Sequence, residues 1–472
     1  MPARRAVTAL ACFLLLLASR LCHVAIIWIE EAYPAAGAIQ MLAGKTIYRD
    51  FWFDKPPLSP LTYLLWGGYP GIPLRIADAI LLTAACMLLY LFAERLWTER
   101  EAMAAALLLA FFFTFEFPAS ALAIAPDLLM TIPHIAAVYL AWRGRAFWSG
   151  VVAGIALQTN PKGAFVLAAC LLWNWRAWPL LFAGFAVANA AILAWLAAVG
   201  ALSAYVQQVW VWGFRYARDT FLEHPVRTGL ARTGSWLFFH LALVIGAALY
   251  FRRREPERVR FGLWIVVSLL GVFAGWRFFE RYYFLLLVPM TLLGARAFTV
   301  STRLWKGILT AALLIPLVRF GPRYAMLALD LAHHRQTSWN VLVLNQDSHA
   351  ASDIVDRAAR PGDTLLVWGY RPDIFVYTRM PAGTRFLDSQ PLTGVIADRH
   401  ITIARPTFPK MAAANRAQLA DTRPTFIVDA IGQFNPQLGV RNYPDLHRWL
   451  SGYDEFGRSW GCVIYRRREN AR

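Results

Sequence analysis

Residues 6–33 read AVTALACFLLLLASRLCHVAIIWIEEAY, an apolar run of membrane-spanning length that ends in two adjacent carboxylates. A helix needs about 20 predominantly apolar residues to cross a bilayer. Two arginines, Arg4 and Arg5, precede the run, and basic residues favour the cytoplasmic side of a membrane helix. We therefore predict an uncleaved first membrane helix over Ala6–Ile29 with a cytoplasmic N-terminus. A cleaved signal peptide fits less well, because Arg20 interrupts the region where a small-residue cleavage site would fall.

The rest of the chain repeats this pattern. Of its 472 residues, 58% are hydrophobic and 16% are charged, whereas soluble domains carry about 25% charged residues. The composition therefore predicts a polytopic α-helical membrane protein with about eleven membrane helices. The ten further candidate segments are Leu74–Phe92, Ala102–Phe115, Leu128–Trp142, Phe147–Thr159, Gly163–Trp173, Trp178–Val199, Ser235–Phe251, Phe261–Trp276, Tyr282–Phe298 and Gly307–Phe320.

The formal charge of +18 does not indicate a nucleic-acid partner. The arginines are spread among short loops between apolar segments, and basic loops on the cytoplasmic side are the ordinary mark of membrane topology. With the N-terminus inside, the basic loop Arg252–Arg260 falls inside as well. Eleven spans then place the C-terminal region outside. The partners predicted from composition are membrane lipid and no nucleic acid.

The character of the chain changes after about residue 320. Residues 321–472 contain no apolar run of spanning length, and β-rich runs alternate there with polar helical stretches, Ser348–Arg360 (capped by Ser348) and Met411–Ala420. Such alternation predicts a small α/β domain. We therefore predict a membrane domain over 1–320 and an extracytoplasmic α/β domain over 321–472. The predicted strands are Thr364–Trp368, Ile374–Tyr377, Thr425–Val428 and Cys462–Tyr465.

Acidic and basic residues gather in the predicted outer loops. The first outer loop, 30–73, holds Glu30 and Glu31 and then Lys55, which precedes two prolines that oppose helix. The adjacent acids also fit an ordinary solvated helix start, where carboxylates suit the helix dipole. Three more charged residues, at helix starts and breaks predicted on the same face, favour a functional interpretation: Asp127, Lys162 and Arg281. Carboxylates and cations together suit a base-activated hydroxyl and a phosphate leaving group.

The pattern Glu30-Glu31-Ala32-Tyr33, Met41-Leu42-Ala43-Gly44, Tyr48-Arg49-Asp50-Phe51 and Lys55-Pro56-Pro57 resembles the first outer loop of GT-C glycosyltransferases. The similarity is nearest to the branch that contains protein O-mannosyltransferases and the lipid A aminoarabinose transferase, and it covers roughly residues 1–300. This chain departs from the branch in two places. Glu30 stands where the family has Asp, and Asn160-Pro161 separates Thr159 from Lys162 where the family has Thr-Lys.

The resemblance implies an inverting transfer of a sugar from a polyprenyl-phosphate donor to a lipid, glycan or protein hydroxyl, with no metal and no cofactor. The implied compartment is a bacterial inner membrane with the site facing the periplasm. The site residues implied are Glu30, Glu31 and Asp127 for catalysis, Lys55, Lys162 and Arg281 for the donor phosphate, and Tyr33, Tyr282 and Tyr283 for substrate. Two alternatives stay open: a transporter or flippase of lipid-linked sugars, and a catalytically silent relative.

Overall fold

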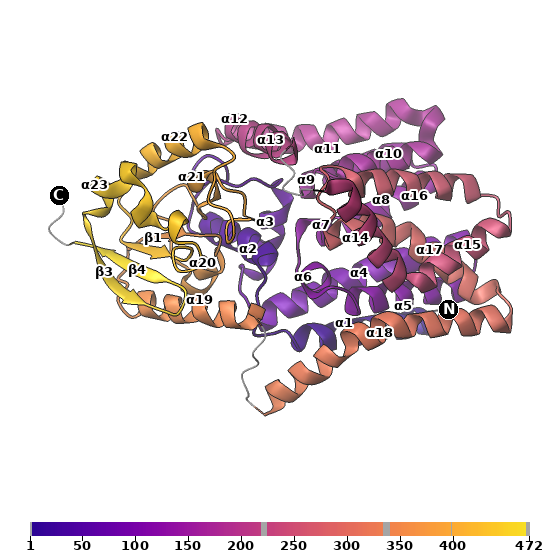
Figure 1. Ribbon diagram of the computed structural model, residues 1–472. Coiled ribbons are helices and arrows are strands. Elements are labelled where there is room, and N and C mark those ends of the chain that lie inside the picture. The colour runs from indigo at the N-terminus through magenta and orange to yellow at the C-terminus, as the bar shows by residue number, and fades with distance from the viewer. Residues whose placement is uncertain (1, 219–223, 334–339, 398, 469–472) are drawn as a thin grey trace.

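The computed structural model describes residues 2–218, 224–333, 340–397 and 399–468. A bundle of helices forms one end of the molecule, and the C-terminal elements, coloured orange to yellow, form the other end (Figure 1). The core of the bundle is built from leucine, alanine and aromatic side chains that are almost completely buried. The helices of the bundle are α1 (Pro2–Leu21), α4 (Ile72–Leu96), α5 (Glu99–Thr114), α8 (Thr131–Trp142), α9 (Ala146–Thr159), α10 (Gly163–Asn174), α11 (Trp178–Ala198), α14 (Pro225–Phe239), α15 (Leu241–Arg252), α16 (Arg258–Phe273), α17 (Phe284–Val300) and α18 (Arg303–Ala332).

Each of the eleven predicted apolar segments overlaps a helix, but the predicted number of spans is not confirmed. By length and composition, four helical stretches of the described residues can cross a bilayer, or five if the pair α14 and α15, bent by 84°, counts as one span. Several other apolar segments form shorter helices, such as α9 with 14 residues. The four stretches are Ile72–Leu96, Gly163–Ala198, Glu280–Val300 and Arg303–Ala332.

The first predicted helix is wrong at its C-terminal end. Helix α1 ends at Leu21, and a new helix, α2 (Ile29–Leu42), begins after a turn. The turn follows Arg20, whose buried guanidinium donates to Asp78 Oδ2 at 3.0 Å and to the Ala121 carbonyl at 2.6 Å. A buried charge must be paired and hydrogen-bonded, and this arginine finds its partners on α4 and on the chain before α7 (Pro126–Leu129).

A layer of short helices lies between the bundle and the C-terminal elements (Figure 1). It contains α2, which carries Glu30 and Glu31 in its first turn. A π-helical turn over Val206–Val211 joins two further elements of the layer; such turns occur often at functional sites. The remaining short helices are α3 (Leu58–Tyr63), α6 (Pro118–Ala121), α12 (Leu202–Tyr205) and α13 (Trp212–Arg218).

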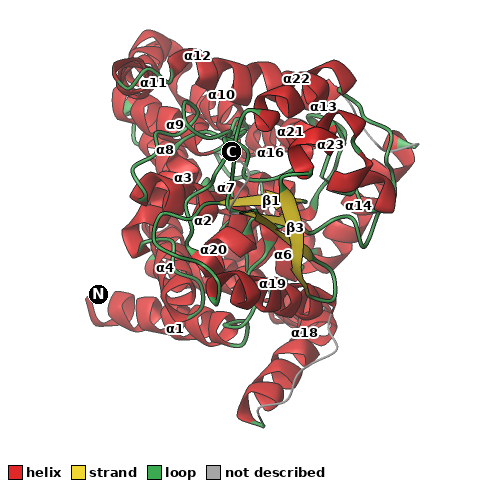
Figure 2. Ribbon diagram, turned by 90° about the vertical axis from the view of Figure 1, so that its left-hand side faces the viewer, coloured by secondary structure: helices red, strands yellow, loops and turns green. Residues whose placement is uncertain are grey.

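The C-terminal region is a four-stranded sheet with helices packed around it (Figure 2). The sheet order is β1-β2-β4-β3; β1 and β2 are parallel, with Leu365 opposite Phe426, and the other pairs are antiparallel. Three of the four predicted strands are confirmed, and β3 was not predicted. The elements are α19 (Asn340–Asp356), β1 (Leu365–Trp368), α20 (Asp373–Thr378), α21 (Gln390–Thr393), α22 (Pro409–Ala420), β2 (Phe426–Asp429), α23 (His447–Leu450), β3 (Tyr453–Arg458) and β4 (Val463–Arg467).

Two local predictions in this region are wrong. The predicted strand Ile374–Tyr377 is helix α20, which begins directly after Pro372 with Asp373 in its first turn; both residues suit a helix start. Ser348 does not cap a helix, because α19 already begins at Asn340. Its hydroxyl instead accepts a hydrogen bond from the Arg371 Nε atom at 2.9 Å.

The C-terminal region is held to the first outer loop by backbone-directed hydrogen bonds. The Gln40 amide donates to the Met380 carbonyl at 3.1 Å and accepts from the Ala382 N–H at 2.7 Å. The Trp52 N–H donates to the Arg385 carbonyl at 2.6 Å. The two regions also share one cluster of buried apolar side chains. Helix α18 runs through residue 320, so the predicted domain boundary falls inside a helix.

At the opposite end of the bundle, the loops predicted to share the inner face do meet. Arg296 at the end of α17 pairs with Glu101 at 2.7 Å and with Glu255 at 3.1 Å. Near the N-terminus, Arg5 pairs with Glu94 at 2.7 Å. The N-terminus, the connection between α4 and α5 and the loop after α15 were all predicted on the inner face, and residues of these segments lie together in space.

Candidate functional site

Four of the predicted site residues come from four separate elements that all start or break at the same end of the bundle. Glu30 lies in the first turn of α2, and Asp127 lies in α7, which begins at Pro126. Lys162 lies in the break between α9 and α10. This break needs glycine, because a Cβ atom at Gly163 would lie 2.2 Å from the backbone nitrogen of Leu157.

The fourth residue, Arg281, lies in a short 3-10 turn, Glu280–Tyr283, and joins the others into one chain of alternating charge. Arg281 Nη1 donates to Glu30 Oε1 at 2.7 Å, and its Nε lies 3.7 Å from Asp127 Oδ2. Asp127 Oδ1 lies 3.9 Å from Lys162 Nζ. We call these four residues the charged cluster. Their side chains are 10–24% exposed, so the ion pairs are strengthened by partial removal from water.

Two buried polar atoms of the charged cluster make no hydrogen bond within the described ranges. They are Asp127 Oδ1 and Lys162 Nζ, whose separation of 3.9 Å exceeds hydrogen-bond length. The Lys162 ammonium lies over the ring of Tyr282, a favourable cation–π position. Buried polar groups almost always have partners, so these two atoms are candidates for contact with a ligand.

Lys55 belongs to a second group next to the cluster. Its ammonium lies 3.3 Å from Asp54 Oδ2, which also accepts from the Trp212 indole at 3.4 Å. The same ammonium lies 5.8 Å from the ring centroid of Tyr216, and the Arg277 guanidinium stacks on that ring at 3.7 Å. Among the ion pairs of the described residues, none joins Lys55 to the charged cluster directly.

Both groups face residues of the C-terminal region, Tyr370 and Asp388. Burial raises the pKa of Tyr370, and the negative charges of Asp388, Asp54 and Glu30 raise it further. Burial raises the pKa of Asp388 to about 7; the Gln390 N–H bond opposes the rise, and the charge of Asp54 adds to it. Tyr370 lies in the turn Gly369–Asp373 after β1, and loops that follow strands often carry binding residues.

The remaining predicted residues lie away from the charged cluster. Glu31 is fully buried, and its two carboxylate oxygens accept from Arg75 at 2.7 and 2.9 Å. It also accepts from the Trp28 N–H at 3.1 Å, which caps α2. Tyr33 is buried against Phe53, with ring centroids 4.7 Å apart.

Tyr33 also fixes the first outer loop, and Tyr283 belongs to the helix packing. Burial raises the pKa of Tyr33 well above its usual value, and the charges of Asp54 and Asp388 raise it further. The Tyr283 hydroxyl is hydrogen-bonded to Thr233 Oγ1 at 2.8 Å, and its ring stacks on Trp236 at 5.4 Å. The structure therefore does not bring Tyr283 into the charged cluster.

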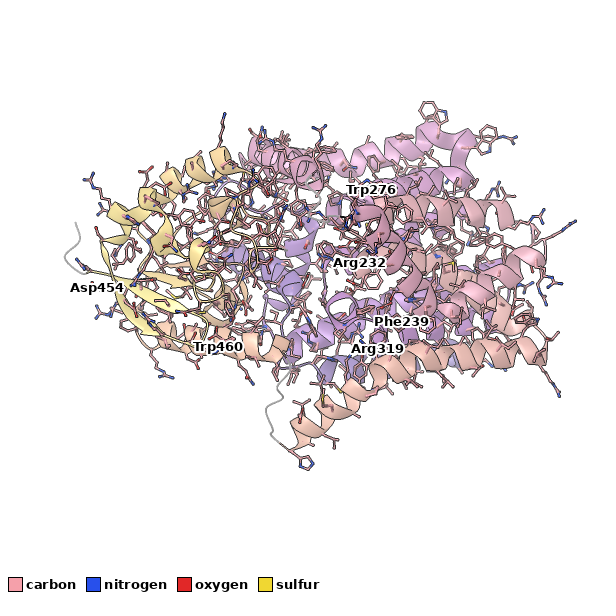
Figure 3. The ribbon with its side chains drawn as sticks, viewed as in Figure 1. Arg232, Phe239, Trp276, Arg319, Asp454 and Trp460 are labelled. Carbon is pink, nitrogen blue, oxygen red and sulfur yellow. The ribbon has the colours of Figure 1, made fainter. Side chains whose placement is uncertain are left out.

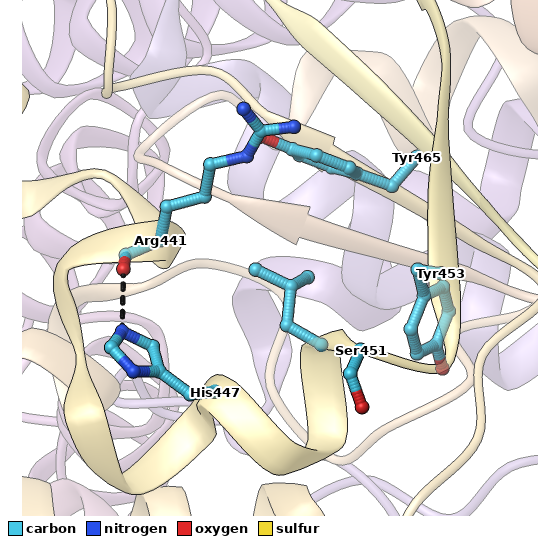
Figure 4. A pocket seen from close by; sticks show the side chains of 6 residues that line it. Arg441, His447, Ser451, Tyr453 and Tyr465 are labelled. Carbon is cyan, nitrogen blue, oxygen red and sulfur yellow. Dashed lines mark hydrogen bonds between the residues drawn. The ribbon is translucent and has the colours of Figure 1, made fainter.

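A hollow elsewhere on the protein contains none of the predicted site residues. It lies beside the β3–β4 hairpin at the far end of the C-terminal region, and His447 Nε2 lies 2.9 Å from the Arg441 carbonyl at its edge (Figure 4). Over the described ranges, no group of three or more His, Cys, Asp or Glu side chains is arranged to hold a metal ion.

The helix bundle, the layer of short helices and the C-terminal α/β region together form a fold that is also found in solved structures of other proteins. The fold is that of ArnT from Cupriavidus metallidurans. The apo structure of ArnT matches at a TM-score of 0.57 with 14% identity, over 98% of this chain and 97% of that one. The structure of ArnT bound to undecaprenyl phosphate matches at 0.53 with 14% identity, over 99% and 98%.

A second protein of this fold is the Archaeoglobus fulgidus oligosaccharyltransferase. Its apo structure matches at a TM-score of 0.53 with 12% identity, over 99% of this chain and 75% of that one. No family model matches the sequence. No curated protein matches it either.

Proposed function

We propose that the protein is an integral membrane glycosyltransferase that moves a sugar from a polyprenyl-phosphate donor to an acceptor hydroxyl, with inversion at the anomeric carbon. The observation that carries this proposal is the charged cluster, in which Lys162 Nζ and Asp127 Oδ1 are buried without hydrogen-bond partners among the described residues. A phosphate oxygen supplies the acceptor that Lys162 needs, and a sugar hydroxyl supplies the donor that Asp127 needs.

In the proposed reaction the cluster residues divide the work. Lys162 and Arg281 hold the donor phosphate, and fixed cations there stabilise the charge that grows as the leaving group departs. The phosphate competes with Glu30 for Arg281, which frees the carboxylate to act as general base. Glu30 removes the proton of the acceptor hydroxyl, whose oxygen bonds to the anomeric carbon. The bond from that carbon to the phosphate oxygen breaks, and its electron pair leaves with the lipid phosphate.

The flanking residues orient the reactants in this proposal. Asp127 binds the sugar, and Lys55 adds a second cation beside the phosphate. Tyr282 supports Lys162 through its ring. Glu31 does not touch substrate but positions Glu30, because its bonds to Arg75 and the Trp28 N–H fix the first turn of α2. Tyr33 and Tyr283 act through packing, the first on the outer loop and the second on α14.

The proposed location is a bacterial inner membrane with the site and the C-terminal region on the periplasmic side. The meeting of Arg5, Arg296 and their acidic partners at the opposite end of the bundle supports a cytoplasmic face there. ArnT, whose fold this chain shares, is bound to undecaprenyl phosphate in one structure, which supports a lipid-phosphate donor.

The decisive test uses the purified full chain in nanodiscs with radiolabelled polyprenyl-phosphate sugars and membrane extract as acceptor. Glu30→Gln keeps the shape of the side chain but cannot accept the proton, so transfer should fall at least about a hundredfold. Glu280→Gln removes a carboxylate next to Arg281 but outside the cluster, and transfer should stay within about twofold of wild type. Near-normal turnover by Glu30→Gln would exclude Glu30 as the base.

The alternatives are separated in proteoliposomes. A flippase would move the labelled lipid between leaflets without consuming it, and a silent relative would bind the lipid without either event. Either result for the wild-type protein would contradict the proposed reaction.

A further inference from the structure

The segment Gly275–Phe278, between α16 and the turn that carries Arg281, has an unfavourable backbone. Trp276 and Phe278 have φ angles of 53° and 50°, and Gly275 has φ of 83°. Non-glycine residues in this left-handed region persist only when their surroundings compensate for the strain, and such residues gather at functional sites. Helix α14 supplies several of the contacts that hold this segment.

Helix α14 clamps the strained segment in two ways. Arg232 Nη1 donates to the carbonyls of Arg277 and Phe278, both at 3.2 Å. One turn earlier, Gly229 allows the Phe278 ring to lie directly against the helix, since a Cβ atom there would come within 2.5 Å of it. Figure 3 labels Arg232 and Trp276 in this part of the molecule.

The clamped segment connects the two groups of the site. Arg277 is 2% exposed, stacks on Tyr216 at 3.7 Å and donates to the Tyr216 carbonyl at 3.0 Å. Lys55 also lies near that ring, with its ammonium 5.8 Å from the ring centroid. Four residues beyond Arg277, Arg281 pairs with Glu30. A shift of the segment would therefore move the cations of both groups at once.

We propose that Arg232 is a positioning residue that holds the strained segment Gly275–Phe278 in place. By doing so it sets the distance between Arg281 and the group formed by Arg277, Tyr216 and Lys55. That distance determines the affinity of the site for a lipid phosphate. This inference rests on the proposed function. Arg232 itself touches only backbone carbonyls among these residues, so its effect reaches the ligand through Arg277 and Arg281.

The test compares Arg232→Ala, Arg232→Lys and the control Arg227→Ala in nanodiscs, with undecaprenyl phosphate as the probe. Arg227 lies on the same helix and is exposed. Removing both hydrogen bonds should weaken lipid-phosphate binding about tenfold and raise the apparent KM for donor while kcat falls less than about threefold. Lysine can donate to either carbonyl and should recover most of the affinity, and Arg227→Ala should bind as wild type does.

Hydrogen exchange over residues 273–284 provides a readout that does not depend on activity. Exchange there should accelerate in Arg232→Ala but not in Arg227→Ala, with thermal stability changed by no more than a few degrees. Wild-type affinity in Arg232→Ala, unchanged exchange, or a loss that lysine does not recover would each overturn the proposal. If the wild-type protein binds no lipid phosphate, the proposed function is wrong. The hydrogen-exchange rates over residues 273–284 then decide by themselves whether Arg232 holds the strained segment in place.

Discussion

Asp388 should make the stability of the C-terminal region depend on pH in a way that one substitution removes. The side chain is 3% exposed, and burial raises its pKa from 3.8 to about 7, with Asp54 adding to the rise. The folded protein therefore keeps a proton on Asp388 that the unfolded chain has already released. Between about pH 4 and pH 7, stability falls by about 1.4 kcal/mol per pH unit from this group, and the loss is complete above pH 7.

Asp388→Asn removes the titration and keeps an oxygen that can accept the Gln390 N–H, a bond of 2.8 Å. From pH 5 to pH 8 the wild type should lose about 2.7 kcal/mol through Asp388 that the variant keeps. If the C-terminal region melts as a unit of roughly 150 residues, the variant should gain about 9 °C on the wild type over this interval. Thermal unfolding in nanodiscs, followed by near-ultraviolet circular dichroism at both pH values, measures the difference.

The control is Asp353→Asn, which removes an exposed carboxylate from α19. An equal melting temperature difference between Asp388→Asn and wild type at pH 5 and pH 8 would refute the reasoning. So would a variant that is less stable than wild type at pH 8, because the negative charge would then be favoured by its surroundings.

Two further predictions follow from buried charges. Arg75→Ala leaves the fully buried Glu31 without its bidentate partner and should lower the free energy of unfolding by about 3–5 kcal/mol. Adding Glu31→Gln should recover part of that loss. A loss below about 1 kcal/mol in chemical unfolding would contradict the structural role of the Arg75–Glu31 pair. Lys162→Met should weaken undecaprenyl phosphate binding by about 10–100-fold, since a charge-assisted hydrogen bond contributes about 1.5–3 kcal/mol, and an unchanged Kd would remove Lys162 from the phosphate site.

The sequence predicts the features of the fold that depend on short-range physics. Apolar segments became helices, and Pro126 and Gly163 mark the helix starts beside which Asp127 and Lys162 lie. The first predicted helix failed because Arg20 sits within an apolar run and its partner, Asp78, is 58 residues away. The apolar run Ile374–Tyr377 fits strand or buried helix by periodicity alone, and only Pro372 could have decided it.

The residues of the candidate site also differ in how well the sequence predicts them. Glu30, Asp127, Lys162 and Arg281 could be chosen because charges beside membrane helices are rare, and the structure places them in contact. Tyr370 lies in a loop after a strand, a local pattern that often carries binding residues, whereas Asp388 has no such local sign and lies more than 300 residues from Glu30. Glu30 and Glu31 cannot be told apart from the sequence. The tertiary contact with Arg75 is what distinguishes Glu31 from Glu30 in the structure.

The bonds between Gln40 and the segment 380–382 join residues about 340 positions apart. During biosynthesis the first outer loop is made while most of the chain has not yet been translated, so the Gln40 amide waits for partners that are made near the end of translation. Tyr370 and Asp388 arrive with those partners. Assembly of the complete candidate site therefore has to wait for the last quarter of the chain, and a chain that ends before residue 380 lacks these contacts.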